Sequence, residues 1–384
     1  MIINKRIMRS SNEKQVLQQI INEGPISRSQ ISRNLALNKV TVSDIYNQLL
    51  HRGIIREIGL GASTKSGGRR PLMGILNTDR DFVVVISLQK RQLELLVGRL
   101  DASEISRQQI PVAGINLTAV MDLLTAKLTA LVTSSAKVLV GMIFAVDGTV
   151  ASNRIITTEL SGLEHFDLAK YFRDQFQVPV IIENKANLAA IFERDFVSRP
   201  DEANVLTLWL DHQVQVGIVA DGRLYRGHEG RAGEIGSAYL NEALAVSVDE
   251  RVSQQALIDQ LQPLLDSGTL SEASLKQAIK AHDEAVMACL TTWSKDVAVV
   301  IQRLTINFAP DVIVLNAEIL DWDPSLLAMI QHELKWLKPV ITIPVILTQD
   351  HIETMLLGGL AAIIHHALGL DELTLRFKQP RNEP

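Results

Sequence analysis

From Asp81 onward the sequence alternates between short apolar segments and longer segments whose apolar residues recur at helical spacing. Such alternation is typical of α/β folds, in which helices cover a mainly parallel sheet. It occurs in two clusters, which predicts two lobes with a cleft between them. Strands are expected at 82–87, 93–100, 137–144, 178–183, 204–210, 215–220, 312–316 and 341–347, and helices at 117–132, 166–176, 184–196, 325–337 and 353–368, with further helices up to residue 309.

Residues 1–78 have a different pattern, in which three short helices precede two strands. Apolar spacing predicts the first helix at 12–22, and Glu23-Gly24-Pro25 ends it. Ser27 and Asn38 are suitable N-caps for a second helix and for a third, which ends at Gly53. Strands are expected at 54–61 and 72–76, on either side of a polar tip. This order of elements is that of a winged helix-turn-helix, whose third helix enters the major groove of DNA.

The third helix is expected to present polar side chains to DNA. Burial of Val42, Ile45 and Leu49 turns its short polar and cationic side chains outward, where they can reach base edges and phosphates. Two adjacent arginines lie where a wing would meet the DNA backbone or a narrow minor groove. The predicted DNA-binding residues are Arg28, Asn38, Lys39, Thr41, Ser43, Asn47, Arg69 and Arg70. A plain three-helix domain with a polar face and an exposed loop is the alternative.

The charge is divided unevenly along the chain. Residues 1–75 contain twelve Lys and Arg against four Asp and Glu, whereas the net charge of all 384 residues is −5. A basic module on an acidic body indicates that one end meets a polyanion. The single cysteine, Cys289, excludes an internal disulfide and a multi-cysteine zinc site. No apolar run of transmembrane length and no secretory signal is evident, so a cytoplasmic location is expected.

Several motifs carry a resemblance to a known family. RSSNEKQVLQQI, GPISRSQISRNLAL, NKVTVS and GGRRP occur in the first 78 residues, and PVIIENKANLAA, LYRGHEGRAGEIGS and DERVSQQAL occur later. Together they resemble the ROK family of repressors and sugar kinases, most closely its xylose-repressor branch. The resemblance implies a winged helix-turn-helix at 1–78 and a two-lobed, actin-like (ribonuclease-H-like) α/β domain at 79–370. A C-terminal tail is expected at 371–384.

The chain departs from the family at the positions that catalysis needs. The resemblance places Lys185 where the kinases have a catalytic aspartate, and an ammonium cannot accept the proton of a sugar hydroxyl at neutral pH. The first phosphate-binding motif is replaced by Ser87-Leu88-Gln89, and the second by residues 211–217, which include Gln213 and Gln215. Ser237 stands in place of a zinc-binding histidine, and the cysteine cluster before Asp249 is deleted. We therefore expect no catalytic residue, no metal and no cofactor.

The remaining family positions predict an effector pocket. Carboxylates and amides suit the hydroxyl groups of a sugar. The resemblance implies that an effector would contact Asn184, Lys185, Glu234, Ser237 and Asp249. Lys185 would either favour an anionic ligand or neutralise Glu234. The alternative is a pocket that has lost its ligand.

The sequence as a whole predicts a homodimeric repressor that binds operator DNA, regulates carbohydrate-utilisation genes, xylose genes among them, and responds to a sugar or sugar derivative. Two other functions stay open. One is a ROK-type carbohydrate kinase with a fused DNA-binding domain. The other is a DNA-binding scaffold that needs no ligand.

Overall fold

The computed structural model describes residues 5–61, 70–158, 160–197, 199, 202–241, 245–265, 269–337 and 341–378. Its N-terminal part contains the three helices and the strand pair that the sequence predicts. The first helix is longer than expected, and a short strand precedes the second. The elements are α1 (Lys5–Glu23), β1 (Ile26–Ser27), α2 (Arg28–Asn34), α3 (Lys39–His51), β2 (Ile55–Leu60) and β3 (Leu72–Leu76).

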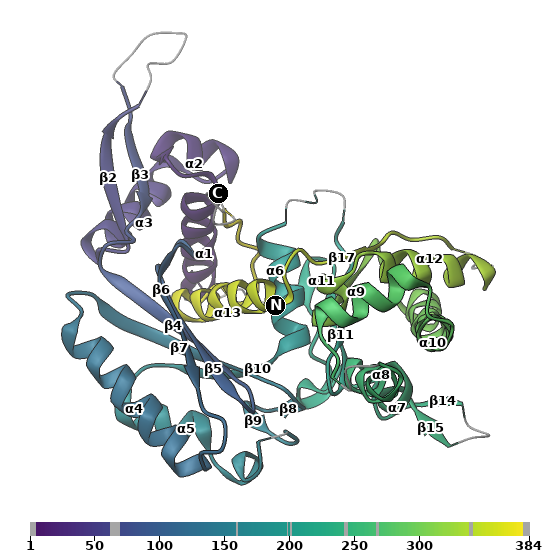
Figure 1. Ribbon diagram of the computed structural model, residues 1–384. Helices are drawn as coiled ribbons and strands as arrows, with labels where there is room; N and C mark the ends of the chain where they lie inside the picture. The colour runs from purple at the N-terminus through teal and green to yellow at the C-terminus, as the bar shows by residue number, and fades with distance from the viewer. Residues whose placement is uncertain are drawn as a thin grey trace.

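Local signals explain where these helices begin. The Ser27 side chain accepts a hydrogen bond from the Gln30 amide at 3.3 Å, and Asn38 Oδ1 accepts one from the Val40 amide at 2.8 Å. Both N-caps that the sequence predicts are therefore confirmed. β2 and β3 pair antiparallel, and β1 adds to the β3 edge. The β2–β3 ribbon projects away from the rest of the molecule (Figure 1).

The first lobe is a five-stranded sheet with helices on both faces. Its strand order is β10-β7-β4-β5-β6. Alternate side chains of β4 divide between the faces, with Phe82 and Val84 in the core on one side and Val83 and Val85 in the core on the other. The bounds are β4 (Asp81–Leu88), β5 (Gln92–Gly98), β6 (Glu104–Pro111), α4 (Leu117–Ser134), β7 (Val138–Val146), β8 (Val150–Ala151), β9 (Arg154–Ile155), α5 (Leu168–Phe176) and β10 (Val180–Asn184), with a 3₁₀ turn at Leu163–His165.

Among the described residues one helix, α4, has the length and apolar composition of a membrane span. Four of its residues, Val120, Met121, Leu124 and Leu128, are buried in the same core as β4 and β5. This packing is that of a helix covering a sheet.

The second lobe is built on a sheet of order β13-β12-β11-β16-β17. Leu206, Leu208 and Leu210 of β11 share a core with Trp293 of the long helix α10, whereas Val205 lies in the core of the opposite face. The elements of this lobe are α6 (Lys185–Asp195), β11 (Val205–Leu210), β12 (Val214–Ala220), β13 (Arg223–Leu224), β14 (Tyr239–Asn241), β15 (Val246–Ser247), α7 (Val248–Val252), α8 (Gln254–Leu261), α9 (Glu272–Ala281), α10 (Glu284–Phe308), β16 (Val312–Asn316), α11 (Glu318–Trp322), α12 (Ser325–Trp336) and β17 (Val345–Leu347), with 3₁₀ turns at His228–Gly230 and Gln262–Leu264. The last helix, α13 (His351–Leu368), returns to the first lobe and packs on β4 and β7, on the sheet face opposite α4 and α5.

One strand is shorter than the sequence predicts. The expected strand at 341–347 pairs only over Val345–Leu347. Pro344 has no amide hydrogen to donate to a sheet, and only its carbonyl is used, as acceptor from the Ile313 amide at 3.0 Å.

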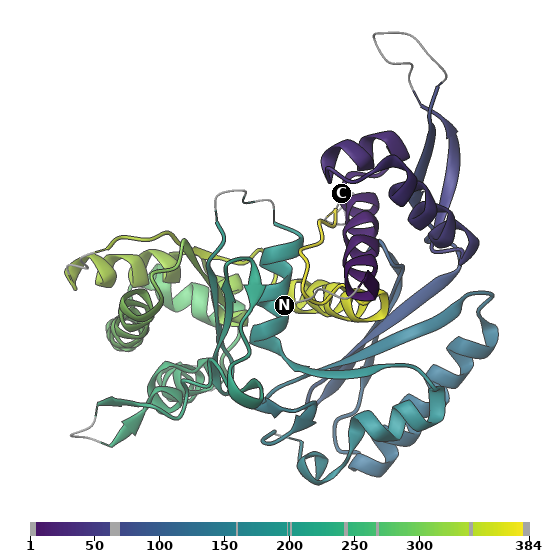
Figure 2. The same ribbon diagram turned by 180° about the vertical axis from the view of Figure 1, so that it is seen from behind.

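Helix α6 lies between β12 of the second lobe and α13, at the middle of the molecule (Figures 1 and 2). Glycines allow both close approaches. A Cβ on Gly217 of β12 would lie 2.0 Å from the Ala186 carbonyl oxygen, and a Cβ on Gly358 of α13 would lie 1.9 Å from that of Leu188. Gly217 belongs to the segment that matches the family's second phosphate loop, and in this chain it makes room for a helix.

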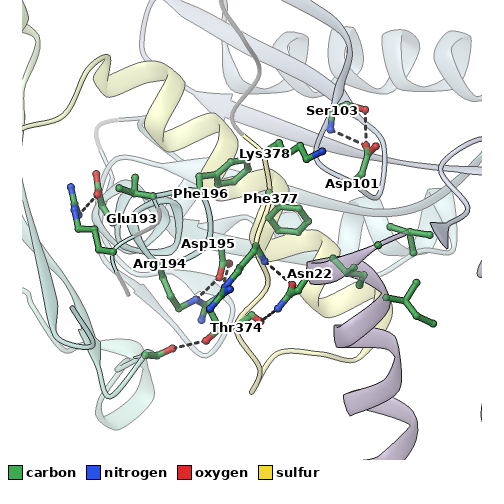
Figure 3. Close-up of a pocket in the computed structure, with 18 of the residues that line it drawn as sticks. Asn22, Asp101, Ser103, Glu193, Arg194, Asp195, Phe196, Thr374, Phe377 and Lys378 are labelled. Atoms are coloured by element: carbon green, nitrogen blue, oxygen red, sulfur yellow. Dashed lines mark hydrogen bonds and ion pairs between the residues drawn. The ribbon is translucent and has the colours of Figure 1, made fainter. Parts of the chain in front are cut away.

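The segment expected as a C-terminal tail packs against the body over its described part. We call residues 371–378 the C-terminal strap. The Thr374 carbonyl accepts hydrogen bonds from Gln18 Nε2 at 2.8 Å and Asn22 Nδ2 at 3.2 Å, both on α1. The Phe377 ring lies 5.3 Å from the Phe196 ring, centroid to centroid, just beyond α6 (Figure 3). The strap therefore ties the N-terminal module to the end of α6, beside an interdomain cavity of about 880 Å³.

Candidate functional site

The predicted DNA-binding residues occupy three kinds of position. Lys39 and Asn47 are exposed on α3, and Thr41 and Ser43 are half-buried on the same helix. Arg70 is exposed just before β3, at the end of the β2–β3 ribbon that is far from the body, whereas Arg69 lies outside the described residues. This leaves an exposed polar surface along α3 with a cation on the neighbouring ribbon.

Two of the predicted residues have structural contacts as well. The Arg28 guanidinium donates to Glu57 Oε1 at 3.1 Å and lies 4.4 Å from the centroid of the Tyr46 ring. These contacts connect α2 to β2 and α3. The Asn38 carboxamide oxygen caps α3, so its NH₂ group is the part left to meet DNA.

The outermost stripe of α3 contains residues that the sequence analysis did not select. Val40, Asp44 and Asn47 are all exposed and follow the spacing i, i+4, i+7, opposite the buried Val42 and Ile45. The helical pattern of the sequence contains this signal, but Val40 and Asp44 are apolar and acidic and are not among the short polar and cationic residues predicted to bind DNA.

The predicted effector residues meet at the junction of the two lobes. Asn184 ends β10, and its side chain caps α6 by accepting from the Asn187 amide at 2.8 Å. Glu234 and Asp249 come from the second lobe, and both are half-buried. Ser237 is exposed, on the loop that follows Gly236. Four of the five predicted residues therefore lie in or beside the junction.

Lys185 is buried at this junction and bridges two carboxylates. Its Nζ lies 2.7 Å from Asp147 Oδ2, just after β7 of the first lobe, and 3.5 Å from Asp211 Oδ2, just after β11 of the second. The same ammonium lies 5.7 Å from the centroid of the Trp209 ring. Lys185 thus pairs with Asp147 and Asp211 rather than with Glu234.

The pKa values of Lys185 and Asp147 are shifted by burial and by the charges around them. Burial alone would lower the pKa of Lys185, but Asp147 and Asp211 raise it above its usual value, so the ammonium is charged at neutral pH. Burial raises the pKa of Asp147, and Asp211 adds to this, while Lys185 opposes it. An ammonium held between two carboxylates has no lone pair to accept a proton, so it cannot serve as the base of a sugar kinase.

Hydrogen bonds also cross the junction at Glu234. Its carboxylate accepts from Thr149 Oγ1 at 2.9 Å and from Gln215 Nε2 at 3.0 Å, and the same Gln215 amide donates to the Gly148 carbonyl. Burial raises the pKa of Glu234 despite these two donors. Gln215 is therefore a lobe-to-lobe contact in the segment where the kinases bind phosphate.

Asp249 is held close to the same group of residues. Its Oδ1 accepts from the Val214 amide at 2.6 Å, at the start of β12. Burial raises the pKa of Asp249, and the hydrogen bond opposes this. A Cβ on Gly236 would lie 2.1 Å from the same oxygen, so the loop that contains Ser237 packs directly on Asp249.

The residues at the family's zinc position do not suit a zinc ion. Zinc prefers thiolate and imidazole ligands, and Ser237 supplies a hydroxyl. The segment between Ser237 and Asp249 contains no cysteine or histidine. Among the described residues there is no group of three or more His, Cys, Asp or Glu side chains that could hold a metal ion.

Three residues that contact the predicted set were not predicted from the sequence: Asp147, Thr149 and Asp211. Asp147 and Thr149 follow a predicted strand, where polar residues of α/β proteins meet at a sheet edge, and this position was the available signal. Asp211 lies in the segment 211–217, which was interpreted from the sequence only as an altered phosphate-binding motif. Their pairing with α6 and Glu234 depends on how the two lobes are brought together.

Comparison with known proteins agrees with this architecture. The ROK family model matches residues 89–366. Xylose repressors of Lactiplantibacillus pentosus and Staphylococcus xylosus are 33% and 30% identical to this chain, covering 98% and 96% of it and 98% of each relative. A solved ROK family transcriptional regulator, described as a homologue of the Escherichia coli MLC protein, shares the fold with a TM-score of 0.78 at 18% identity, over 94% of this chain and 98% of its own. The chain belongs to the ROK family.

Proposed function

We propose that this protein is a DNA-binding transcriptional repressor of carbohydrate-utilisation genes, acting in the cytoplasm on xylose genes. The observation that carries the proposal is the 33% identity to a xylose repressor over 98% of both chains, the N-terminal module included. In this proposal residues 1–78 form a winged helix-turn-helix. The face of α3 enters the major groove, and the ribbon with Arg69 and Arg70 meets the backbone or the minor groove.

We propose that the effector is a neutral sugar bound at the lobe junction. Lys185 is already paired with two carboxylates, and Glu234 and Asp249 add negative charge, so an anionic sugar phosphate would be repelled. Sugar hydroxyls can replace the hydrogen bonds of Glu234 to Thr149 and Gln215. Because those bonds join the lobes, a ligand that replaces them favours a different lobe arrangement, as a regulatory ligand must.

Helix α6 supplies a route from this junction to the DNA-binding module. Its first residue is Lys185, and its last, Asp195, lies about 15 Å away along an 11-residue helix. The Asp195 carbonyl accepts from the Phe377 amide at 2.9 Å, and the strap contacts α1. A shift of α6 would therefore move the strap and α1 together.

The first prediction concerns operator release. Full-length protein should bind an operator duplex with an affinity that falls steeply with salt, because phosphate contacts release counterions. D-Xylose should weaken binding by roughly 5- to 150-fold, the usual range of allosteric coupling. Glu234→Ala should abolish this response, and Glu229→Ala, an exposed residue of the same loop, should preserve it. Fluorescence anisotropy with labelled duplex measures both effects.

Two outcomes would contradict the proposal. Sugar-dependent ATP turnover by the same preparation would favour the kinase with a fused DNA-binding domain. Operator binding that no sugar changes would favour the ligand-independent scaffold.

The second prediction concerns assembly, and we propose a homodimer joined through the second lobe. Ile306 of α10 is 72% exposed and Trp336 of α12 is 70% exposed. The two helix ends are adjacent, since Gln302 Nε2 donates to the Leu337 carbonyl at 3.3 Å. Light scattering should report twice the mass of 42.4 kDa, and Trp336→Glu should give monomers. A wild-type monomer at working concentration would refute the dimer.

A further inference from the structure

Helix α3 has one strongly exposed apolar side chain. Val40 is 66% exposed, whereas Val42, Ile45 and Leu49 of the same helix are at most 2% exposed. With 3.6 residues per turn, Val40 lies on the side of α3 away from these three residues. The position is therefore not needed for the core of the N-terminal module.

The neighbours of Val40 on this stripe indicate which part of DNA it would face. Asp44 and Asn47 follow it one and two turns later, and both are exposed. A carboxylate is repelled by phosphates, but it can accept a hydrogen bond from the exocyclic amine of cytosine, and an Asn can bond adenine in two places. The stripe thus suits the floor of the major groove, with Lys39 beside it for a phosphate.

We propose that Val40 contacts the 5-methyl group of a thymine in the operator and is a specificity-determining residue. This inference rests on the DNA-binding function proposed above. The thymine methyl is the apolar group that a base edge presents in the major groove. Val40 has no hydrogen-bonding side-chain atom, so a purine N7 placed against it would lose its partner. Contact between the two apolar groups removes both from water.

The test uses thymine analogues in the operator. Full-length protein first selects its preferred sequence from a random duplex library, and each thymine of that sequence is then replaced in turn by deoxyuridine. Deoxyuridine lacks only the methyl group and keeps the base pair. Wild-type protein should bind about fourfold more weakly at the contacted thymine, as expected for one exposed methyl group. Val40→Ala should bind the thymine and deoxyuridine duplexes equally at that position.

Val138→Ala is the matched control, because Val138 is an exposed valine on the first lobe. It should keep the wild-type response to every deoxyuridine. The proposal is wrong if wild-type protein tolerates deoxyuridine at every thymine, or if Val40→Ala keeps the wild-type sensitivity. A protein that selects no DNA sequence at all would overturn the DNA-binding function, and this proposal with it.

Discussion

Replacing Lys185 with Met should destabilise the folded protein by about 3–5 kcal/mol at pH 7, because the change leaves two carboxylates without their buried cation. Met has nearly the length of the lysine stem, so little volume is lost. The Asp147 and Asp211 side chains are only 19% and 30% exposed, which limits how far water can replace the ammonium. Urea denaturation of wild type and variant measures the difference.

The pH dependence of this loss has a definite sign. Burial raises the pKa of Asp147 even with Lys185 present, and removing Lys185 takes away an influence that lowers it. A carboxyl group whose pKa is raised on folding favours the protonated folded state, so its charged form destabilises the fold as the pH rises through that pKa. The difference in the free energy of unfolding between wild type and Lys185→Met should therefore become smaller as the pH falls from 7 toward 5.

A lysine on the surface provides the control for this variant. Lys295 is exposed on α10, and Lys295→Met should change stability by no more than about 0.5 kcal/mol at either pH. A Lys185→Met protein as stable as wild type at pH 7 would contradict the buried bridge. The same variant should also alter the response to sugar, since Lys185 connects the two lobes.

The sequence predicts local structure at this site better than it predicts contacts. The helix expected at 184–196 is confirmed with its start one residue later, because Asn184 is its N-cap, and both features depend on adjacent residues. The partner of Lys185 could not, because Asp147 is 38 residues away and lies in the other lobe. The hypothesis that Lys185 neutralises Glu234 paired two positions that the family resemblance assigns to one pocket, whereas the structure pairs Lys185 with Asp147 and Asp211.

The N-terminal module illustrates the same limit. Apolar spacing correctly placed α2 and α3, since one face of each helix must be buried. Polarity was a weaker guide to the surface: Arg28 is paired with Glu57, and the exposed Val40 was left out. In the C-terminal strap, Leu375 and Phe377 are buried, and the alternation of Leu373, Leu375 and Phe377 with polar residues was the signal that it packs.

Replacing Phe377 with Ala should disconnect the DNA-binding module from the lobe junction. The ring is 7% exposed and packs on Phe196, and its backbone amide bonds the Asp195 carbonyl at the end of α6. Phe→Ala changes at buried sites cost about 3–5 kcal/mol, and here the loss falls on the contact between the strap and α6. D-Xylose should still raise the melting temperature of the variant, because the lobe junction is unchanged.

In Phe377→Ala, by contrast, D-xylose should hardly change operator affinity, so the ratio of the operator dissociation constants with and without the sugar should be close to one. Anisotropy titrations with and without the sugar measure this ratio, and thermal shift in the same buffer verifies that the sugar is bound. Ile115→Ala is the control, since Ile115 is 44% exposed before α4 on the first lobe and should leave both measurements unchanged. If Phe377→Ala kept the wild-type ratio, the proposed route along α6 and Phe377 would be wrong. Sugar binding would then affect the DNA-binding module through contacts other than the strap.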